Sequence, residues 1–180
     1  TLAFVMKYFM DMAEDMRTKN VSCSLQYGRR YLEASKYDWA AIEVAGLGAD
    51  AGTIDDAIRK YLKKTKGLWV MANDYFYLAV SMAKQGASPA VIEDLIKLMF
   101  ELKIKSIPIL EDLTQLVGRK PTRNEIFSLV MVERKDMASK SSDMHERYCN
   151  FAGKYLSPYD VALVKETLDQ KVEEWKKFID

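Results

Sequence analysis

The sequence predicts an all-α protein that folds as one domain over residues 1–180. In most segments apolar residues recur every three or four positions, which is the spacing of one face of a helix. No segment shows the alternation of apolar and polar residues, bounded by turn residues, that is typical of a half-buried strand. We therefore expect a bundle of seven or eight helices.

This bundle is expected to form around a buried central helix at about residues 68–84. Within residues 68–83 only Asn73, Asp74 and Ser81 are plainly polar, so a helix drawn through them is apolar on nearly every side. The segment is too short, and has a carboxylate too near its middle, to span a bilayer. It fits a helix that other helices enclose.

Four helices are expected before the central one, at about residues 2–16, 24–34, 35–44 and 53–66. Ser35, followed by Asp38, has the pattern of a capping signal for a short helix. Thr53 is expected to cap the fourth helix. The glycine-rich residues 46–52 between the third and fourth helices form a loop.

After the central helix, proline positions set the expected boundaries. Ser88 and Pro89 open a helix that Pro108 breaks near Ser106, because proline lacks an amide hydrogen and clashes with the preceding turn. A shorter helix at 109–118 follows. The last two expected helices are a long one over about 121–152 and one that begins at about residue 157.

Composition and charge indicate the class of protein. The chain is 49% hydrophobic and 29% charged, which is typical of a globular protein. Its 27 Lys and Arg residues nearly balance 26 Asp and Glu residues, so only local clusters could favour a polyanion or a membrane surface. Cys23 and Cys149 lie far apart in the sequence, and we expect two reduced thiols rather than a disulfide between them. With no visible signal peptide or membrane span, we expect an intracellular, cytoplasmic protein without membrane contact.

No sequence motif predicts an enzyme. Nucleotide-binding glycine patterns and a hydrolase nucleophile motif are absent, and we expect neither a catalytic residue nor a cofactor. His145 and Cys149 lie four residues apart on one helix face, and both residue types bind zinc. They are weak metal candidates, because a structural zinc site needs four ligands and the chain has one histidine.

Two carboxylates are candidates for buried polar positions. Asp74 lies within the expected central helix, and Glu133 lies in the apolar stripe of the long helix. A buried carboxylate is costly unless a cation or another donor reaches it. Each residue therefore either pairs with a donor or lines a polar pocket, where Asp74 would anchor a small apolar ligand or cofactor.

Three basic clusters, two of them interleaved with aromatic residues, could bind a polyanion. Their cations are Arg29, Arg30, Arg59, Lys60, Lys63, Lys64, Lys66, Arg119, Lys120 and Arg123. Such cations meet phosphates, and aromatic rings stack on bases. Solvated helix faces would give the same pattern, and no named nucleic-acid motif is present.

These observations lead to three hypotheses of function. The first is a non-enzymatic helical binding or assembly protein that contacts a polyanion such as nucleic acid. The second is a helical bundle with an internal pocket near Asp74. The third is a protein–protein interaction module that uses the methionine-rich first helix, which carries Met6, Met10, Met12 and Met16. A partner protein or a second copy of the chain would then be the ligand.

Overall fold

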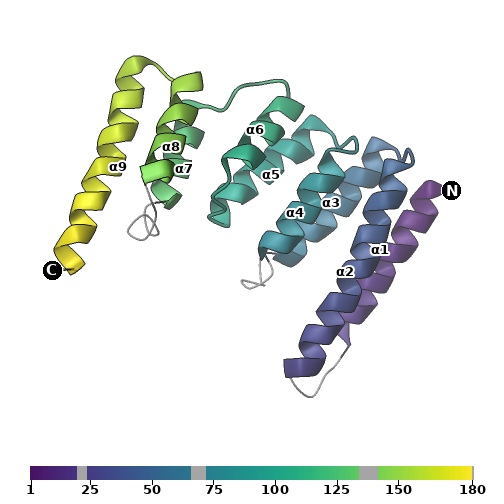
Figure 1. Ribbon diagram of the computed structural model, residues 1–180. Coiled ribbons are helices and arrows are strands. Elements are labelled where there is room, and N and C mark those ends of the chain that lie inside the picture. The colour runs from purple at the N-terminus through teal and green to yellow at the C-terminus, as the bar shows by residue number, and fades with distance from the viewer. Residues whose placement is uncertain (20–23, 66–71, 134–141, 180) are drawn as a thin grey trace. The chain divides into compact units, whose positions relative to one another are not determined.

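The computed structural model describes residues 1–19, 24–65, 72–133 and 142–179, and within them it is all-helical (Figure 1). The expected all-α class is therefore confirmed for the described residues. Their nine helices are α1 (Leu2–Thr18), α2 (Ser24–Gly46), α3 (Ala51–Thr65), α4 (Ala72–Ala83), α5 (Pro89–Glu101), α6 (Ile107–Leu116), α7 (Arg123–Glu133), α8 (Ser142–Tyr155) and α9 (Pro158–Ile179). No helix in this part of the chain is long and apolar enough to cross a membrane.

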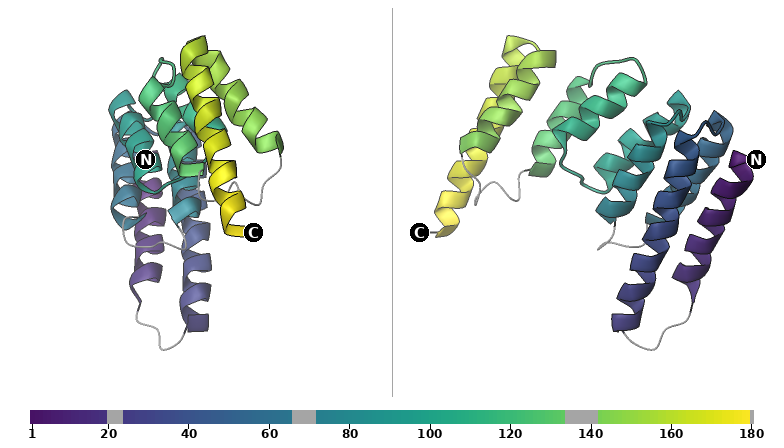
Figure 2. Two further views of the ribbon diagram at one scale, coloured as in Figure 1. Left: turned by 90° about the vertical axis from the view of Figure 1, so that its left-hand side faces the viewer. Right: turned by 45° about the vertical axis from the view of Figure 1, so that its right-hand side comes forward.

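The helices form two compact units, unit 1 (Thr1–Leu95) and unit 2 (Ile96–Asp180). In unit 1, α1 packs on α2 and α3 packs on α4, as two antiparallel pairs that also contact each other (Figures 1 and 2). The core of unit 1 includes fully buried Met6, Ile58 and Phe76. A single bundle built around residues 68–84 stays a prediction.

The two helices expected over 24–34 and 35–44 are one helix, α2. Ser35 is not a cap: its hydroxyl donates to the Tyr31 carbonyl one turn earlier, at 2.9 Å. Asp38 consequently lies in the middle of α2, on its buried face. The expected loop is confirmed in outline, since α2 ends at Gly46 and α3 begins at Ala51. The cap of α3 is Asp50, whose carboxylate accepts from the Thr53 amide at 3.0 Å.

Residues 68–71 of the expected central helix lie outside the described residues, and the rest of it is helical as expected. Its described part, α4, begins at Ala72, and Asn73, Asp74 and Tyr77 are exposed on it. The remaining side chains of α4 are mostly buried against α2 and α3. Asp74 lies in the first turn, where a carboxylate favours the helix dipole.

In unit 2, proline and capping residues set the helix ends much as expected. Ser106 caps α6 and accepts from the Ile109 amide at 3.3 Å, with Pro108 in the first turn. The single long helix expected over 121–152 is wrong, because α7 and α8 are separate helices that contact each other. Helix α9 packs on both of them.

Candidate functional site

A row of polar side chains crosses the core of unit 1 and takes one residue from each of α1 to α4. The Arg17 guanidinium forms a salt bridge with Asp38 through Nη2 and donates from Nε to the Tyr75 hydroxyl at 3.0 Å. Tyr61 donates its hydroxyl to the other carboxylate oxygen of Asp38. The Arg17 and Asp38 side chains are 6% and 1% exposed, so water screens this pair very little.

Two aromatic rings lie next to the guanidinium. Its central carbon lies 4.8 Å from the Tyr75 ring centroid and 5.9 Å from that of Tyr61. The two rings stack with centroids 6.3 Å apart. Burial raises the pKa of Tyr61 far above its ordinary value, although the Arg17 charge opposes the rise. Tyr61 therefore stays a neutral donor to Asp38.

The row was not found from the sequence, although a periodic signal was present. Asp38 occupies one position of the buried stripe of α2, together with Tyr31, Ala34, Ala41 and Ala45. The expected boundary at Ser35 divided that stripe and made Asp38 look like a capping residue. Arg17 likewise continues the buried stripe of α1, which was expected to end at Met16.

The expected burial of Asp74 is wrong, since its side chain is exposed in the first turn of α4. An exposed carboxylate cannot anchor an internal ligand, so the pocket hypothesis loses its polar group. The prediction for Glu133 lies outside the described side chains, although its backbone ends α7.

Four cations of the basic clusters make ion pairs with carboxylates. Arg59 pairs with Asp94 at 2.9 Å, Lys60 with Asp11 at 3.0 Å, Arg119 with Glu125 at 2.7 Å and Arg123 with Asp160 at 2.9 Å. A phosphate would have to compete with these carboxylates. The clusters at Arg59 and Arg119 are thus less available to a polyanion than the sequence suggested.

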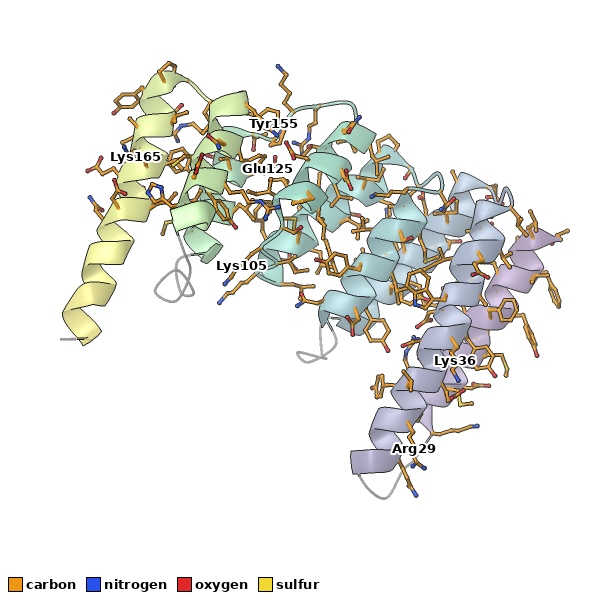
Figure 3. All side chains as sticks on the ribbon, viewed as in Figure 1. Arg29, Lys36, Lys105, Glu125, Tyr155 and Lys165 are labelled. Atoms are coloured by element: carbon orange, nitrogen blue, oxygen red, sulfur yellow. The ribbon has the colours of Figure 1, made fainter. Side chains whose placement is uncertain are left out.

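The other cluster cations differ in exposure. Arg29, Lys63 and Lys120 are exposed, and Arg30 is half-buried with its guanidinium 5.5 Å from the Tyr31 ring. The side chain of Lys64, and Lys66 as a whole, lie outside the described residues. Arg29 lies near the start of α2 (Figure 3), the part of α2 that extends beyond the end of α3 (Figure 1).

A groove of about 390 Å³ lies between α1 and α3. Ala3, Met6 and Met10 from α1 and Ala57 from α3 form its apolar part. Its polar part is formed by Lys7, Thr53, Asp56 and Lys60. The groove thus has the two features of a peptide-binding cleft, an apolar floor and charged walls.

A larger hollow of about 610 Å³ in unit 2, beside α6 and the end of α8, is more polar. Its charged lining is occupied by internal contacts. Glu111 accepts from Lys154 at 3.1 Å and from the Tyr155 hydroxyl at 2.8 Å, and Arg119 is held by Glu125. Tyr155 and Glu125 are labelled in Figure 3.

The two metal candidates lie together, but in an arrangement that does not suit a metal. Cys149 Sγ lies 3.8 Å from His145 Nδ1, while His145 Nε2 lies 2.7 Å from Asp169 Oδ1 on α9. The thiol and the carboxylate therefore approach opposite nitrogens of the ring and cannot share one ion with it. No group of three or more ligating side chains in the described part of the chain could hold a metal.

Comparison of the chain with protein-family models, with curated protein sequences and with solved structures gave no match.

Proposed function

We propose that the chain is a non-enzymatic helical binding and assembly protein that holds a segment of a partner protein in the groove between α1 and α3. The observation that carries this proposal is the pairing of an apolar floor with charged walls on two helices that contact each other. The methionine-rich first helix supplies three of the four residues of that floor.

The floor is suited to an adaptable apolar contact. Met6 and Ala57 are almost completely buried, so Met10, which is 7% exposed, and half-buried Ala3 present most of the accessible apolar surface of the floor. Methionine side chains can change rotamer at little cost to fit different apolar groups. A partner side chain the size of Leu or Met would gain from being removed from water there.

The walls define the charges that the partner segment should carry. Lys7 on α1 and Asp56 on α3 are both exposed at the groove. Lys60 is held by Asp11, which leaves Lys7 as the more available cation. We therefore propose a short amphipathic segment that places an apolar side chain on the floor, an acidic residue near Lys7 and a basic residue near Asp56.

The test is selection of peptides from a random library against the whole protein. We expect enriched peptides to combine apolar, acidic and basic residues, and to bind at least about tenfold less well to the Lys7→Glu, Asp56→Lys double variant, a loss of about 1.4 kcal/mol. The matched control, Lys165→Glu with Glu166→Lys, makes the same two charge reversals on α9 and should bind normally. Peptides that bind both double variants equally would contradict the proposal.

Contact with a polyanion is a second candidate function, supported by exposed cations near three helix ends of unit 1. Arg29 is exposed near the start of α2, and Lys63 is exposed near the end of α3. Lys19 is exposed one residue beyond the end of α1. Among the described residues, no ion pair of Lys19, Arg29 or Lys63 would have to break before these side chains contact phosphates.

Salt dependence tests this second function. Two phosphate contacts on duplex DNA predict a slope of about −1.8 in log affinity against log salt. The Arg29→Glu, Lys63→Glu variant should remove most of that slope, while Arg147→Glu with Lys165→Glu should leave it unchanged. If the unmodified protein binds neither DNA nor RNA at about 50 mM salt, where screening is weak, this function is excluded.

A further inference from the structure

Helices α8 and α9 of unit 2 align a thiol, an imidazole and a carboxylate. His145 and Cys149 lie one turn apart on α8, and Asp169 reaches the histidine from α9. The spacing of His145 and Cys149 pairs them already in the sequence, whereas Asp169 comes from another helix and has no local signal. A carboxylate, a histidine and a nucleophile in this order form the arrangement that activates a thiol or hydroxyl in many proteins.

The contact with Asp169 determines which ring nitrogen can accept a proton. The carboxylate lies 2.7 Å from Nε2, so Nε2 is the nitrogen that carries hydrogen in the neutral ring. Nδ1 then has a free lone pair, and the Cys149 sulfur lies 3.8 Å from it. His145 is therefore placed to take the thiol proton, and Asp169 to hold the ring in the tautomer that can do so.

We propose that Cys149 is a site of thiol–disulfide exchange with low-molecular-weight disulfides, with His145 as its general base and Asp169 as a positioning residue. Cys149 is a free, half-buried thiol. In the exchange its sulfur attacks one sulfur of the disulfide, and the S–S bond breaks as the new one forms. The thiol proton passes to His145 Nδ1 and then to the departing thiolate. The products are a mixed disulfide on Cys149 and one free thiol.

The charges around Cys149 explain why a base would matter. Burial raises the pKa of the thiol above its ordinary value, the Asp169 carboxylate adds to the rise, and Lys165 opposes it. On α7, the described charged residues Arg123 and Glu125 are held by Asp160 and Arg119. Little free thiolate is therefore present at neutral pH, and attack without a base would be slow.

The test is the rate of reaction with dithiodipyridine, an uncharged aromatic disulfide that releases a coloured product. Cys23→Ser leaves Cys149 as the only cysteine of the full chain. With His145 as base, the rate should change with pH much less steeply than a thiolate reaction between about pH 7 and 8.5, because the imidazole takes the thiol proton during the attack. In His145→Gln it should rise about tenfold per pH unit, following the thiolate, and be at least about tenfold lower at pH 7.

Two further variants complete the test. Asp169→Asn can stabilise the other tautomer, so it should lower the rate about three- to tenfold while keeping one reacting thiol. Glu146→Gln, which neutralises the neighbour of His145, should react as the parent does. Unfolding would expose the thiol and accelerate the reaction, so a lower rate cannot come from a misfolded variant. A parent rate that rises tenfold per pH unit and equals that of His145→Gln would overturn the proposal.

Discussion

Each compact unit contains a row of polar side chains that connects different helices, and the two rows end differently. In unit 1, Arg17, Asp38, Tyr61 and Tyr75 join four helices, and the ion pair between Arg17 and Asp38 is almost completely buried. In unit 2, the row from Cys149 through His145 ends at Asp169, whose side chain is 57% exposed.

This difference in burial predicts different roles. A buried ion pair makes a small net contribution to stability, but the loss of one partner leaves a charge that neither water nor protein compensates. An ion pair open to water contributes little to stability, because solvent replaces the lost partner. The row in unit 1 should therefore control folding, and the row in unit 2 should control the chemistry of Cys149.

The largest expected effect is that of Asp38→Asn. It leaves the Arg17 guanidinium buried without a counterion, which should lower the free energy of unfolding by about 3–5 kcal/mol. Asp74→Asn in the same unit removes an exposed carboxylate and should cost less than about 1 kcal/mol. Urea unfolding followed by circular dichroism measures both. If the two variants lost the same free energy of unfolding, water would have to reach the ion pair between Arg17 and Asp38.

A double variant makes the comparison sharper. Arg17→Met and Asp38→Leu should each be strongly destabilising, because each leaves its partner's charge unpaired. Combined, they remove both charges, so the double variant should be more stable than the sum of the single effects predicts, by about 2–3 kcal/mol. An additive double variant would show that the two side chains do not depend on each other in solution.

The tyrosines of this row should show a smaller and graded effect. Tyr61→Phe removes a hydrogen bond to the buried Asp38 carboxylate and should cost about 1.5–3 kcal/mol. Tyr75→Phe removes an acceptor from Arg17, and stacking of the new ring on the guanidinium persists, so about 1 kcal/mol is expected. The same urea titration ranks the two variants, and a larger loss for Tyr75→Phe would contradict the geometry.

Unit 2 offers a smaller effect that depends on pH. Burial of Glu125 would raise the pKa of its carboxyl, but hydrogen bonds from Arg119 and Thr122 outweigh it and lower that pKa below the ordinary 4.5. Glu125 therefore adds stability above pH 4.5 that is lost as the pH falls through its lowered pKa in the fold. Glu125→Gln should cost about 1–2 kcal/mol at neutral pH and weaken this acid dependence. An unchanged pH profile of unfolding would exclude the role of Glu125.

Asp38 and Asp74 show which features of the fold could be predicted from the sequence and which could not. The helices that carry them were predicted, but the burial of the two side chains was not. Helical periodicity, prolines and glycines correctly predicted the all-α class and many boundaries, because these signals are local. Whether a carboxylate is buried depends on where its helix begins and on what packs against it. Asp74 lies on the exposed side of α4, and an uninterrupted α2 places Asp38 on a buried face.

The candidate sites were predictable only in part, for a similar reason. Met6, Met10 and Lys60 were recognised as notable residues, but the groove that they share exists only where α1 packs on α3. Arg59 and Arg123 looked available in sequence, yet their partners Asp94 and Asp160 lie more than thirty positions away. Contacts between distant segments are what local patterns do not encode.

The most direct test of the contrast between the two rows applies one substitution, Asp to Asn, to each of them in the Cys23→Ser chain. Each variant is measured both for its free energy of unfolding in urea and for the rate at which Cys149 reacts with dithiodipyridine. Asp38→Asn should lose about 3–5 kcal/mol of stability and keep the thiol rate under native conditions. Asp169→Asn should lower the rate and change stability by less than about 1 kcal/mol. The account would be contradicted if Asp169→Asn were destabilised as much as Asp38→Asn and reacted at the parent rate.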